Sequence, residues 1–370
     1  MTDQTKRTDQ MPRRKVVIVG AGFAGLSCLK HLTPKNACFD ITLIDRKTTS
    51  DFLPLLPDII GRNFPPHMLT HDIAAIAKRC RAEFVNTEAQ SIDVNAKRVV
   101  TPQGEIVFDD LVIACGAETN FYGNTDIQRQ AMTLFSIQDA LKIKETLATQ
   151  TYRHVVVAGG GYTGIEIAGS IRRWLKRHHR QTEVMIVEKM DSILGPLPEW
   201  IKNYTRRQLE EMKINVLLGR TISKTEGGSV TLSDGSRHDE SLLIWVAGVK
   251  TPDLLNDIPV EKIRGRLSVD PCLRVTDHIF AAGDCAAFIE GSQPLRMAVM
   301  FAMGQGKCIA RNIIRTEKNR KAEKYVPLDL GYIIPVANNR SSGILLGKGA
   351  SGFWVTWLHY LISFYRSFQI

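Results

Sequence analysis

The sequence predicts an α/β fold in which one chain of 370 residues builds two Rossmann-like dinucleotide-binding domains. A short apolar strand runs into Gly-x-Gly-x-x-Gly and then a helix-compatible segment at residues 15–32, and the same order returns at residues 154–180. Each of these units is followed by a second apolar strand that ends on an acid, at Asp45 and at Glu188. Strand, glycine turn, helix and acid in this order are typical of a mononucleotide-binding βαβ unit.

The first glycine turn is Gly20-Ala21-Gly22-Phe23-Ala24-Gly25. Gly20 allows the tight turn, Gly22 lets the backbone approach a pyrophosphate, and Gly25 allows the helix to pack closely on the strand. The phosphates would lie at the helix N-terminus, where unpaired N–H groups and the helix dipole favour an anion. Asp45 can accept hydrogen bonds from the ribose hydroxyls of an adenosine half.

The second turn, Gly159-Gly160-Gly161-Tyr162-Thr163-Gly164, repeats this arrangement, with Glu188 as its acid. Two such units imply two dinucleotides. Two dinucleotides held by one protein imply electron transfer between them.

Two further strands end in small residues, at Ala114-Cys115-Gly116 and at Val246-Ala247-Gly248, which lets a backbone run close to a cofactor. Segments 84–107 and 216–243 alternate apolar and polar residues around turn residues, so we expect a β-meander in each. Near residue 280 a strand ends in Gly283-Asp284, a turn and a carboxylate suited to a ribityl or ribose hydroxyl.

This order predicts a discontinuous first domain, residues 15–118 and 250–335, interrupted by a second domain at 119–249. Residues 336–370 are expected to form a C-terminal membrane-associating segment. Residues 1–14 are polar, of mixed charge and without an apolar core, so we expect a disordered lead-in rather than a targeting peptide.

The net charge of +10 and the pI near 9.3 suggest an anionic membrane surface first, bulk solubility second and nucleic acid a distant third, because no nucleic-acid motif is present. Seven scattered cysteines without a closely spaced pair fit a reducing compartment. They argue against a disulfide reductase and give no metal site. Helix 165–180 carries five Lys and Arg residues, for which a solvated face is favoured over a phosphate or membrane contact.

The C-terminal segment 352–368 is rich in Trp, Phe, Leu and Ile. Its polar residues Thr356, His359, Ser363 and Arg366 recur every three or four positions, which predicts a helix with one narrow polar stripe. The run is short for a bilayer span, so a helix lying in the membrane interface is favoured. A helix docked on its own protein or on a second subunit is the alternative.

With these pieces in order, the sequence resembles the type II NADH:quinone oxidoreductases, single-subunit NADH dehydrogenases of the respiratory chain within the two-dinucleotide-binding-domain flavoproteins. The resemblance covers residues 16 to about 366. It rests on the two glycine turns, Leu-Pro-Leu-Leu-Pro at 53–57, Leu-Val-Ile-Ala-Cys-Gly-Ala at 111–117, Trp-Val-Ala-Gly-Val-Lys at 245–250, Ala-Ala-Gly-Asp-Cys-Ala at 281–286 and the aromatic tail.

The resemblance implies FAD on the first unit and NADH on the second. The implied FAD-binding residues are Gly20, Gly22, Phe23, Ala24, Gly25, Asp45, Arg46, Pro54, Leu55, Ala114, Gly116, Gly283 and Asp284. The implied NADH-binding residues are Gly160, Gly161, Tyr162, Thr163, Gly164, Glu166, Glu188, Ala247 and Gly248. Glu166 matches the family's acid beside the nicotinamide and the flavin, and is the expected catalytic residue. Glu188 would repel a 2′-phosphate, which favours NADH over NADPH.

The implied reaction passes a hydride from NADH to flavin and then two electrons to a membrane quinone, without proton pumping, on the cytoplasmic side of the membrane. A homodimer is possible within this resemblance. The family's two quinone-site glutamines correspond here to Met300 and Gly304, and Lys348 could supply a donor there instead, although a solvated loop lysine fits it equally.

Two alternatives to this function remain at the level of sequence. One is a soluble NADH-dependent flavoprotein reductase with a protein acceptor. The other is a redox-sensing flavoprotein that binds NADH tightly and turns over slowly.

Overall fold

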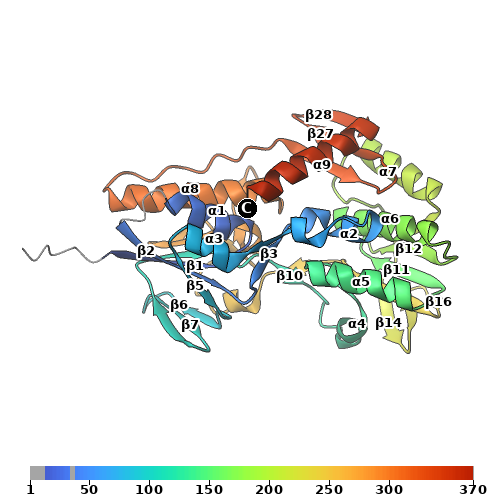
Figure 1. Cartoon of the computed structure of the whole chain (residues 1–370), viewed down its shortest axis with the longest axis horizontal. Coiled ribbons are helices and arrows are strands. Elements are labelled where there is room, and N and C mark those ends of the chain that lie inside the picture. The colour runs from blue at the N-terminus through green and yellow to red at the C-terminus, as the bar shows by residue number, and fades with distance from the viewer. Residues whose placement is uncertain (1–12, 34–37, 370) are drawn as a thin grey trace, which may run out of the picture. The chain divides into compact units, whose positions relative to one another are not determined.

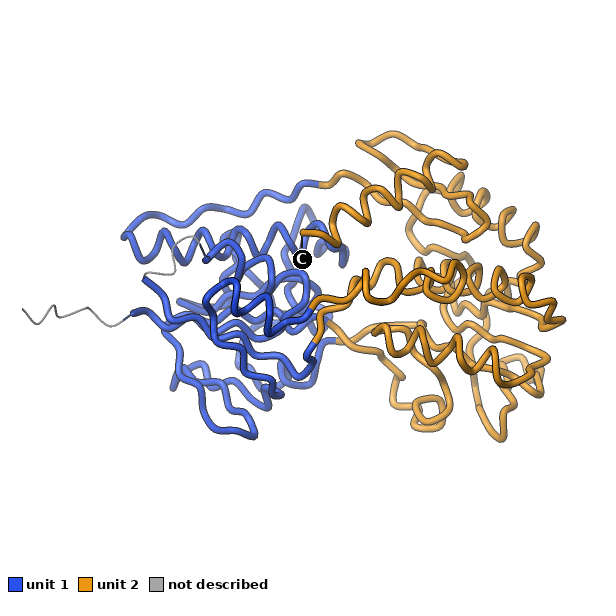
Figure 2. The backbone as a smooth tube through the Cα atoms, viewed as in Figure 1, with its two compact units in different colours: residues 1–48, 72–116, 251–328 blue, residues 49–71, 117–250, 329–370 orange. Residues whose placement is uncertain are grey.

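The computed structural model describes residues 13–33 and 38–369 (Figure 1), so most of the expected lead-in at 1–14 lies outside the described residues. Arg14 already begins the first strand. Two compact units are present (Figure 2). Unit 1 comprises the chain up to Thr48, Asp72–Gly116 and Thr251–Leu328; unit 2 comprises Thr49–His71, Ala117–Lys250 and Asp329–Ile370.

Unit 1 is built on a six-stranded sheet in the order β21-β22-β9-β1-β2-β5, parallel except for the β21–β22 pair. Its strands are β1 (Arg14–Val19), β2 (Phe39–Asp45), β5 (Glu83–Asn86), β9 (Asp110–Ile113), β22 (Ile279–Ala281) and β21 (Arg274–Thr276). The near-continuous apolar runs of β1 and β9 fit a sheet that is buried on both faces.

Helices α1 (Phe23–Leu32), α3 (Ile73–Arg79) and α8 (Val299–Glu317) complete this unit. Helices α1 and α8 touch at backbone distance, because a Cβ on Gly306 would lie 2.1 Å from the Ala24 carbonyl oxygen. The expected meander at 84–107 is shorter than predicted. Residues 83–86 form β5 of the parallel sheet, and only β6 (Ser91–Asp93), β7 (Arg98–Thr101) and β8 (Gly104–Val107) form an antiparallel meander.

The short elements of unit 1 are η4 (Asp253–Leu255), β19 (Lys262–Ile263), β20 (Arg266–Ser268), η5 (Gly283–Cys285), β23 (Ala286–Ala287), β24 (Ile289–Glu290) and β25 (Gln293–Pro294).

Unit 2 contains a four-stranded parallel sheet in the order β13-β12-β11-β17. Its strands are β11 (His154–Ala158), β12 (Glu183–Glu188), β13 (Ile214–Leu218) and β17 (Ser241–Trp245), and its larger helices are α4 (Thr125–Gln130), α5 (Ile137–Thr149), α6 (Tyr162–Arg177) and α7 (Glu199–Glu211). A small antiparallel sheet follows β13, from β14 (Ile222–Glu226), β15 (Ser229–Leu232) and β16 (Arg237–His238). The expected meander at 216–243 therefore also begins and ends in parallel strands.

Two segments expected elsewhere belong to unit 2. Segment 49–71 holds β3 (Thr49–Asp51), η2 (Leu53–Leu55), α2 (Leu56–Gly61), η3 (Pro66–Met68) and the start of β4 (Thr70–Asp72), and was predicted within the first domain. It joins unit 2 because α2 packs on α6, where a Cβ on Gly61 would lie 2.8 Å from the Ser170 Cα.

The C-terminal segment forms β26 (Gly331–Pro335), β27 (Ser341–Leu345), β28 (Lys348–Gly352) and α9 (Phe353–Phe368). The three strands make one antiparallel sheet, and α9 packs on all three. Strands β10 (Glu118–Thr119) and β18 (Val249–Lys250) pair where the chain enters and leaves the central part of unit 2.

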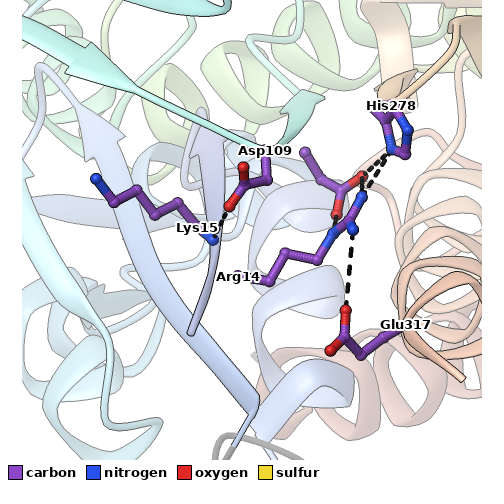
Figure 3. Close-up of polar contacts among 6 residues, drawn as sticks. Arg14, Lys15, Asp109, His278 and Glu317 are labelled. Atoms are coloured by element: carbon purple, nitrogen blue, oxygen red, sulfur yellow. Dashed lines mark hydrogen bonds and ion pairs between the residues drawn. The ribbon is translucent and has the colours of Figure 1, made fainter. Parts of the chain in front are cut away.

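Asp110 holds the start of β1 to the start of β9 in unit 1. Its partners Arg14 and His278 are labelled in Figure 3. Its carboxylate is fully buried and accepts hydrogen bonds from the Arg14 guanidinium, while the His278 Nδ1 lies 3.0 Å from one of its oxygens. Asp110→Asn is expected to lower the free energy of unfolding by about 3 kcal/mol, because it leaves Arg14 without its buried countercharge. Chemical denaturation measures this loss.

The neighbouring Asp109 provides the matched control. Its carboxylate accepts the Lys15 N–H at 2.7 Å at an exposed position, so Asp109→Asn should cost less than about 1 kcal/mol. Equal losses for the two variants would contradict the importance of the buried pair.

Candidate functional site

The first glycine turn has the geometry that a dinucleotide requires. Gly20 has φ of 106°, and a Cβ on it would lie 2.3 Å from the Ala114 carbonyl oxygen. A Cβ on Gly25 would lie 1.8 Å from the Gly20 carbonyl oxygen, so helix α1 packs directly on the turn. A Cβ built on Gly22 would have no atom within 4 Å. Gly22 is the N-cap residue of α1, and no side chain accepts a hydrogen bond from the N–H groups at this helix end. An open glycine at an uncapped helix N-terminus fits a pyrophosphate.

Asp45 lies beside this turn at the end of β2 and is half-buried. Its carboxylate accepts the Ala21 N–H at 2.7 Å and the Lys47 N–H at 2.8 Å, which fixes its orientation. Arg46, also predicted to bind FAD, is exposed and pairs with Glu88 at 3.1 Å. The structure thus brings Asp45, but not the Arg46 guanidinium, to the glycine turn.

The Gly283-Asp284 motif forms η5 directly after β22, the neighbour of β9. The Gly283 N–H donates to the buried Gln305 Oε1 at 2.7 Å, a partner that the sequence did not identify. Burial raises the pKa of Asp284, and the Arg266 guanidinium opposes this shift. At the end of β9, Ala114 is buried and Gly116 adopts φ of 68° with open space around it.

These features of unit 1 fit FAD, since they combine an open glycine cradle, an uncapped helix and carboxylates placed for hydroxyl groups. Pro54 and Leu55, also predicted to contact FAD, belong to η2 of unit 2, where Leu55 is buried. Phe23 begins α1, and Ala24 is buried.

The second glycine turn repeats the geometry of the first. Gly159 has φ of 110°, and a Cβ on it would lie 2.8 Å from the Ala247 Cα. A Cβ on Gly164 would lie 1.8 Å from the Gly159 carbonyl oxygen, while Gly161 faces open space and caps α6 without a side-chain hydrogen bond. The duplication inferred from the sequence therefore extends to the contacts of each glycine.

A cavity of about 410 Å³ opens beside this turn, and Glu188, Arg220, Trp245 and Ala247 line it. Glu188 accepts the Gly160 N–H at 2.6 Å and the Met190 N–H at 2.8 Å, so its carboxylate is held at the tip of β12. Arg220 is a feature that sequence analysis missed. It comes from the loop after β13 and pairs with Asp234 at 2.9 Å.

Glu188→Gln is expected to raise the ratio of NADPH to NADH activity at least about tenfold. The amide oxygen can still accept the Gly160 N–H, while the charge that repels a 2′-phosphate is lost and Lys189 and Arg220 remain in the cavity wall. Steady-state kcat/KM with each nucleotide measures the ratio. Glu183→Gln, at the exposed start of the same strand, is the control. An unchanged ratio in Glu188→Gln would show that Glu188 does not read the ribose.

The remaining predicted NADH residues flank this cavity or the start of α6. The Tyr162 ring meets the Tyr332 ring edge-on at 5.9 Å between centroids, and Thr163 is exposed. Gly248 packs against Tyr122, because a Cβ on Gly248 would lie 2.2 Å from the Tyr122 hydroxyl. The same hydroxyl donates to the Ala247 carbonyl oxygen at 3.3 Å.

Glu166 lies at the start of the second turn of α6 and is half-buried. Burial raises the pKa of its carboxyl well above the usual range, and the negative charge of Asp58 raises it further. Asp58, on α2, is a functional candidate that the sequence gave no reason to single out. Its carboxylate accepts the Tyr360 hydroxyl at 2.8 Å and pairs with the Arg62 Nε at 3.0 Å.

The solvated face expected for the basic residues at 165–180 is present only in part: Lys176 and Arg177 are exposed, while Arg172, Arg173 and Arg180 are half-buried. Arg172 donates to the Met212 and Thr182 carbonyl oxygens, Arg173 to the Ala337 carbonyl oxygen, and Arg177 to the Gly61 carbonyl oxygen. Arg180 likewise reaches the Ala148 carbonyl oxygen. These arginines satisfy backbone carbonyls and join elements of unit 2, because five fixed donors on a long stem suit that task.

Helix α9 docks through its polar stripe and exposes its apolar face. Its buried residues include Thr356, His359, Ser363 and Ser367, so Ser367 rather than the half-buried Arg366 continues the stripe. The Thr356 and Ser341 hydroxyls form a hydrogen bond at 2.7 Å. Burial lowers the pKa of His359 to about 4, so this imidazole is neutral at pH 7.

The opposite face of α9 is apolar and exposed. Trp357 is 63% exposed and Phe368 79%. The full exposed set is Phe353, Trp354, Trp357, Leu361, Tyr365 and Phe368. Among the residues that the structure describes, no helix is long and apolar enough to span a membrane.

The three residues predicted for a quinone mouth are divided between the two units. Met300 and Gly304 lie one turn apart on α8 of unit 1 and are half-buried, and Lys348 is exposed at the start of β28 in unit 2. A Cβ on Gly304 would lie 3.2 Å from the Tyr325 hydroxyl, so a polar group of Tyr325 lies beside Gly304.

The thiols of Cys115 and Cys285 form a contact that sequence spacing did not reveal. Cys285 is buried in η5 and donates to the Ile113 carbonyl oxygen at 3.4 Å. A hydrogen bond with the Cys115 side chain lowers the pKa of Cys285.

Comparison with known proteins places the chain in a family. The model of the Pyridine nucleotide-disulphide oxidoreductase family matches residues 14–306. The type II NADH:quinone oxidoreductases of Staphylococcus haemolyticus and of Staphylococcus aureus strain bovine RF122 are 26% and 25% identical to it, each over 92% of both chains. The structure of NDH2 from Plasmodium falciparum in complex with NADH superposes with a TM-score of 0.83 at 18% identity, over 96% of this chain and 98% of that one.

These matches confirm the predicted resemblance to type II NADH:quinone oxidoreductases and the α/β fold with Rossmann-like domains. They also confirm the prediction of an oxidoreductase that uses FAD and NADH. Because the family model matches well over half of the chain, the protein belongs to the pyridine nucleotide-disulphide oxidoreductase family.

Proposed function

We propose that the protein is a peripheral membrane NADH:quinone oxidoreductase that does not pump protons and acts on the cytoplasmic side of the membrane. The observation that carries the membrane part of this proposal is the polarity of α9. The helix buries Thr356, His359 and Ser363 and exposes both tryptophans, Phe353 and Phe368, whereas a helix on a water-facing surface buries its apolar side chains and exposes its polar ones. Such a face is suited to the headgroup boundary of a bilayer, where a lipophilic quinone is available.

The residues proposed to hold FAD are those of the first glycine turn with Asp45, Gly116 and Asp284. Gly22 and the uncapped start of α1 would receive the pyrophosphate, and Asp45 the ribose hydroxyls. When bound, FAD supplies the chemistry of accepting a hydride and returning two electrons to an acceptor.

The residues proposed to hold NADH are those of the second glycine turn with Glu188. The uncapped N-terminus of α6 would bind the pyrophosphate, and Glu188 would bind the adenosine ribose in the adjoining cavity. Glu166, one turn into α6, would face the reacting end of the nucleotide as a protonated acid, because burial keeps its pKa high.

Steady-state NADH oxidation with a short-chain quinone tests this function. Turnover well above the rate with oxygen alone is expected. Turnover equal to the oxygen rate would refute the quinone as acceptor and leave the two alternatives, a reductase with a protein acceptor or a slow redox sensor. Pelleting with vesicles separates the proposed membrane enzyme from a soluble reductase, which would stay in the supernatant.

A further inference from the structure

We propose that Arg220 is a second determinant of nucleotide choice in unit 2: its guanidinium is placed to bind the 2′-phosphate of NADPH, and an ion pair with Asp234 restrains it. This inference rests on the proposed NADH site, because it concerns the cavity beside the second glycine turn. Glu188 disfavours NADPH by repulsion. Arg220 brings the opposite charge to the same cavity, and Asp234 is a positioning residue that acts through Arg220.

The backbone places Arg220 next to Glu188. Strands β12 and β13 pair in parallel with Glu188 opposite Leu218, so the chain leaves β13 at the tip where Glu188 lies. Two residues further on, the Arg220 N–H donates to the Glu188 carbonyl oxygen at 3.0 Å. Both residues line the cavity of about 410 Å³. A ribose whose 2′ position is held by Glu188 would therefore lie beside Arg220.

The lining of the cavity combines aromatic and charged side chains. The rings of Phe121 and Trp245 stack with their centroids 6.1 Å apart and offer an apolar surface to an adenine. The charged side chains are Glu188, Lys189 and Arg220. A guanidinium suits a phosphate better than an ammonium does, because its planar fork can donate two parallel hydrogen bonds. Arg220 is therefore the stronger candidate for a 2′-phosphate.

Asp234 is held in place by the turn between β15 and β16. One of its carboxylate oxygens accepts the Ser236 N–H at 3.0 Å and the Ser236 hydroxyl at 2.6 Å. The other pairs with the Arg220 Nε at 2.9 Å. The Ser233 N–H donates to the Thr221 carbonyl oxygen at 2.9 Å, which ties this turn to the loop of Arg220. The carboxylate is thus fixed on one side of the guanidinium before any nucleotide binds.

The ion pair is a weak restraint. The side chain of Arg220 is 39% exposed and that of Asp234 is 33% exposed, and a pair of this kind shifts an equilibrium by at most about fivefold. Within the described part of the chain, only Asp234 forms an ion pair with this guanidinium, and it does so through Nε. Glu188 is therefore the larger obstacle to a 2′-phosphate and Asp234 the smaller one.

Two probes that cannot be oxidised by flavin test this inference on the FAD-loaded protein. ADP-ribose stands for NADH and ADP-ribose 2′-phosphate for NADPH, and neither contains a nicotinamide. Isothermal titration calorimetry gives the ratio of their dissociation constants, with every variant built on Glu188→Gln. Adding Asp234→Asn should favour the 2′-phosphate by about three- to fivefold. Adding Arg220→Gln should disfavour it by at least about tenfold, and Arg220→Lys should fall between.

The combined variant shows whether Asp234 acts through Arg220. When Arg220→Gln is present, Asp234→Asn should no longer change the ratio, whereas a merely structural effect of Asp234 would persist. Asp239→Asn is the matched control, because Asp239 pairs with Arg237 at 2.7 Å just after β16 and does not line the cavity. It should leave the ratio unchanged.

Opposite shifts in Asp234→Asn and Arg220→Gln support the inference. A ratio that Arg220→Gln leaves unchanged would overturn it, as would an Asp234→Asn effect that persists without Arg220 or is matched by Asp239→Asn. The probes also separate this inference from the proposed function, because their binding needs no electron acceptor. If the protein reduced no quinone but the ratios shifted as expected, the acceptor alone would fail. If quinone turnover were normal but the ratios did not shift, the role of Arg220 alone would fail.

Discussion

Gly164→Val is expected to reduce NADH oxidation by more than about 100-fold while the protein keeps its flavin. The Cβ at this position would lie 1.8 Å from the Gly159 carbonyl oxygen, so α6 cannot pack on its strand without moving away from the turn. Displacing a packed helix costs more than about 4 kcal/mol, enough to destroy the site that positions NADH. Steady-state rates and the flavin absorbance of the purified variant measure the two effects.

Gly25→Val is the equivalent change in unit 1, because a Cβ on Gly25 would lie 1.8 Å from the Gly20 carbonyl oxygen, the same distance as for Gly164 and Gly159. This variant should lose flavin. Ile167→Val, a conservative change beside Gly164 on the same helix, should keep both flavin and activity. If Gly164→Val lost flavin while Gly25→Val kept it, the assignment of FAD to unit 1 and NADH to unit 2 would be reversed.

The double change Trp354→Ser and Trp357→Ser is expected to weaken binding to anionic vesicles on the order of 100-fold, with little loss of NADH oxidation by a soluble quinone. Both indoles are more than half exposed on the apolar face of α9. Burying such a side chain in a membrane contributes about 1.5–3 kcal/mol. Co-sedimentation with vesicles measures the change.

The matched control keeps the two positions aromatic, as Trp354→Phe and Trp357→Phe, and should retain most of the binding. Equal vesicle binding by the serine and phenylalanine variants would show that α9 does not contact the bilayer. Loss of soluble activity in the serine variant alone would indicate that the exposed face supports the fold of unit 2 instead.

The glycine turns and their acids could be predicted from the sequence because backbone geometry sets those residue types. Gly20, Gly25, Gly159 and Gly164 each have a Cβ position that the backbone occupies, so no other residue fits. This constraint is local and is therefore visible in a short motif.

The hydrogen bond between Tyr360 and Asp58 could not be predicted, because the two residues are distant in sequence. Tyr360 lies 302 positions from Asp58, and no local pattern links the tail helix to α2, which carries Asp58. The grouping of segment 49–71 with unit 2 depends on the same long-range contacts.

Periodicity predicted the tail helix and its stripe, but not which face of it the protein covers. A stripe of Thr, His and Ser suits water or a polar surface equally. Only the hydrogen-bond partners settle the choice: Thr356 bonds Ser341 in β27, and Ser367 donates to the Met68 carbonyl oxygen. The basic residues of α6 illustrate the same limit, since the carbonyls that Arg172 and Arg177 bind come from other elements.

The central claim is that electrons pass from NADH through a bound flavin to a quinone. Anaerobic titration of the purified holoenzyme tests it most directly. One equivalent of NADH should bleach the flavin absorbance, and one equivalent of a short-chain quinone should restore it within a single turnover. Flavin that NADH bleaches but quinone leaves reduced would contradict the claim.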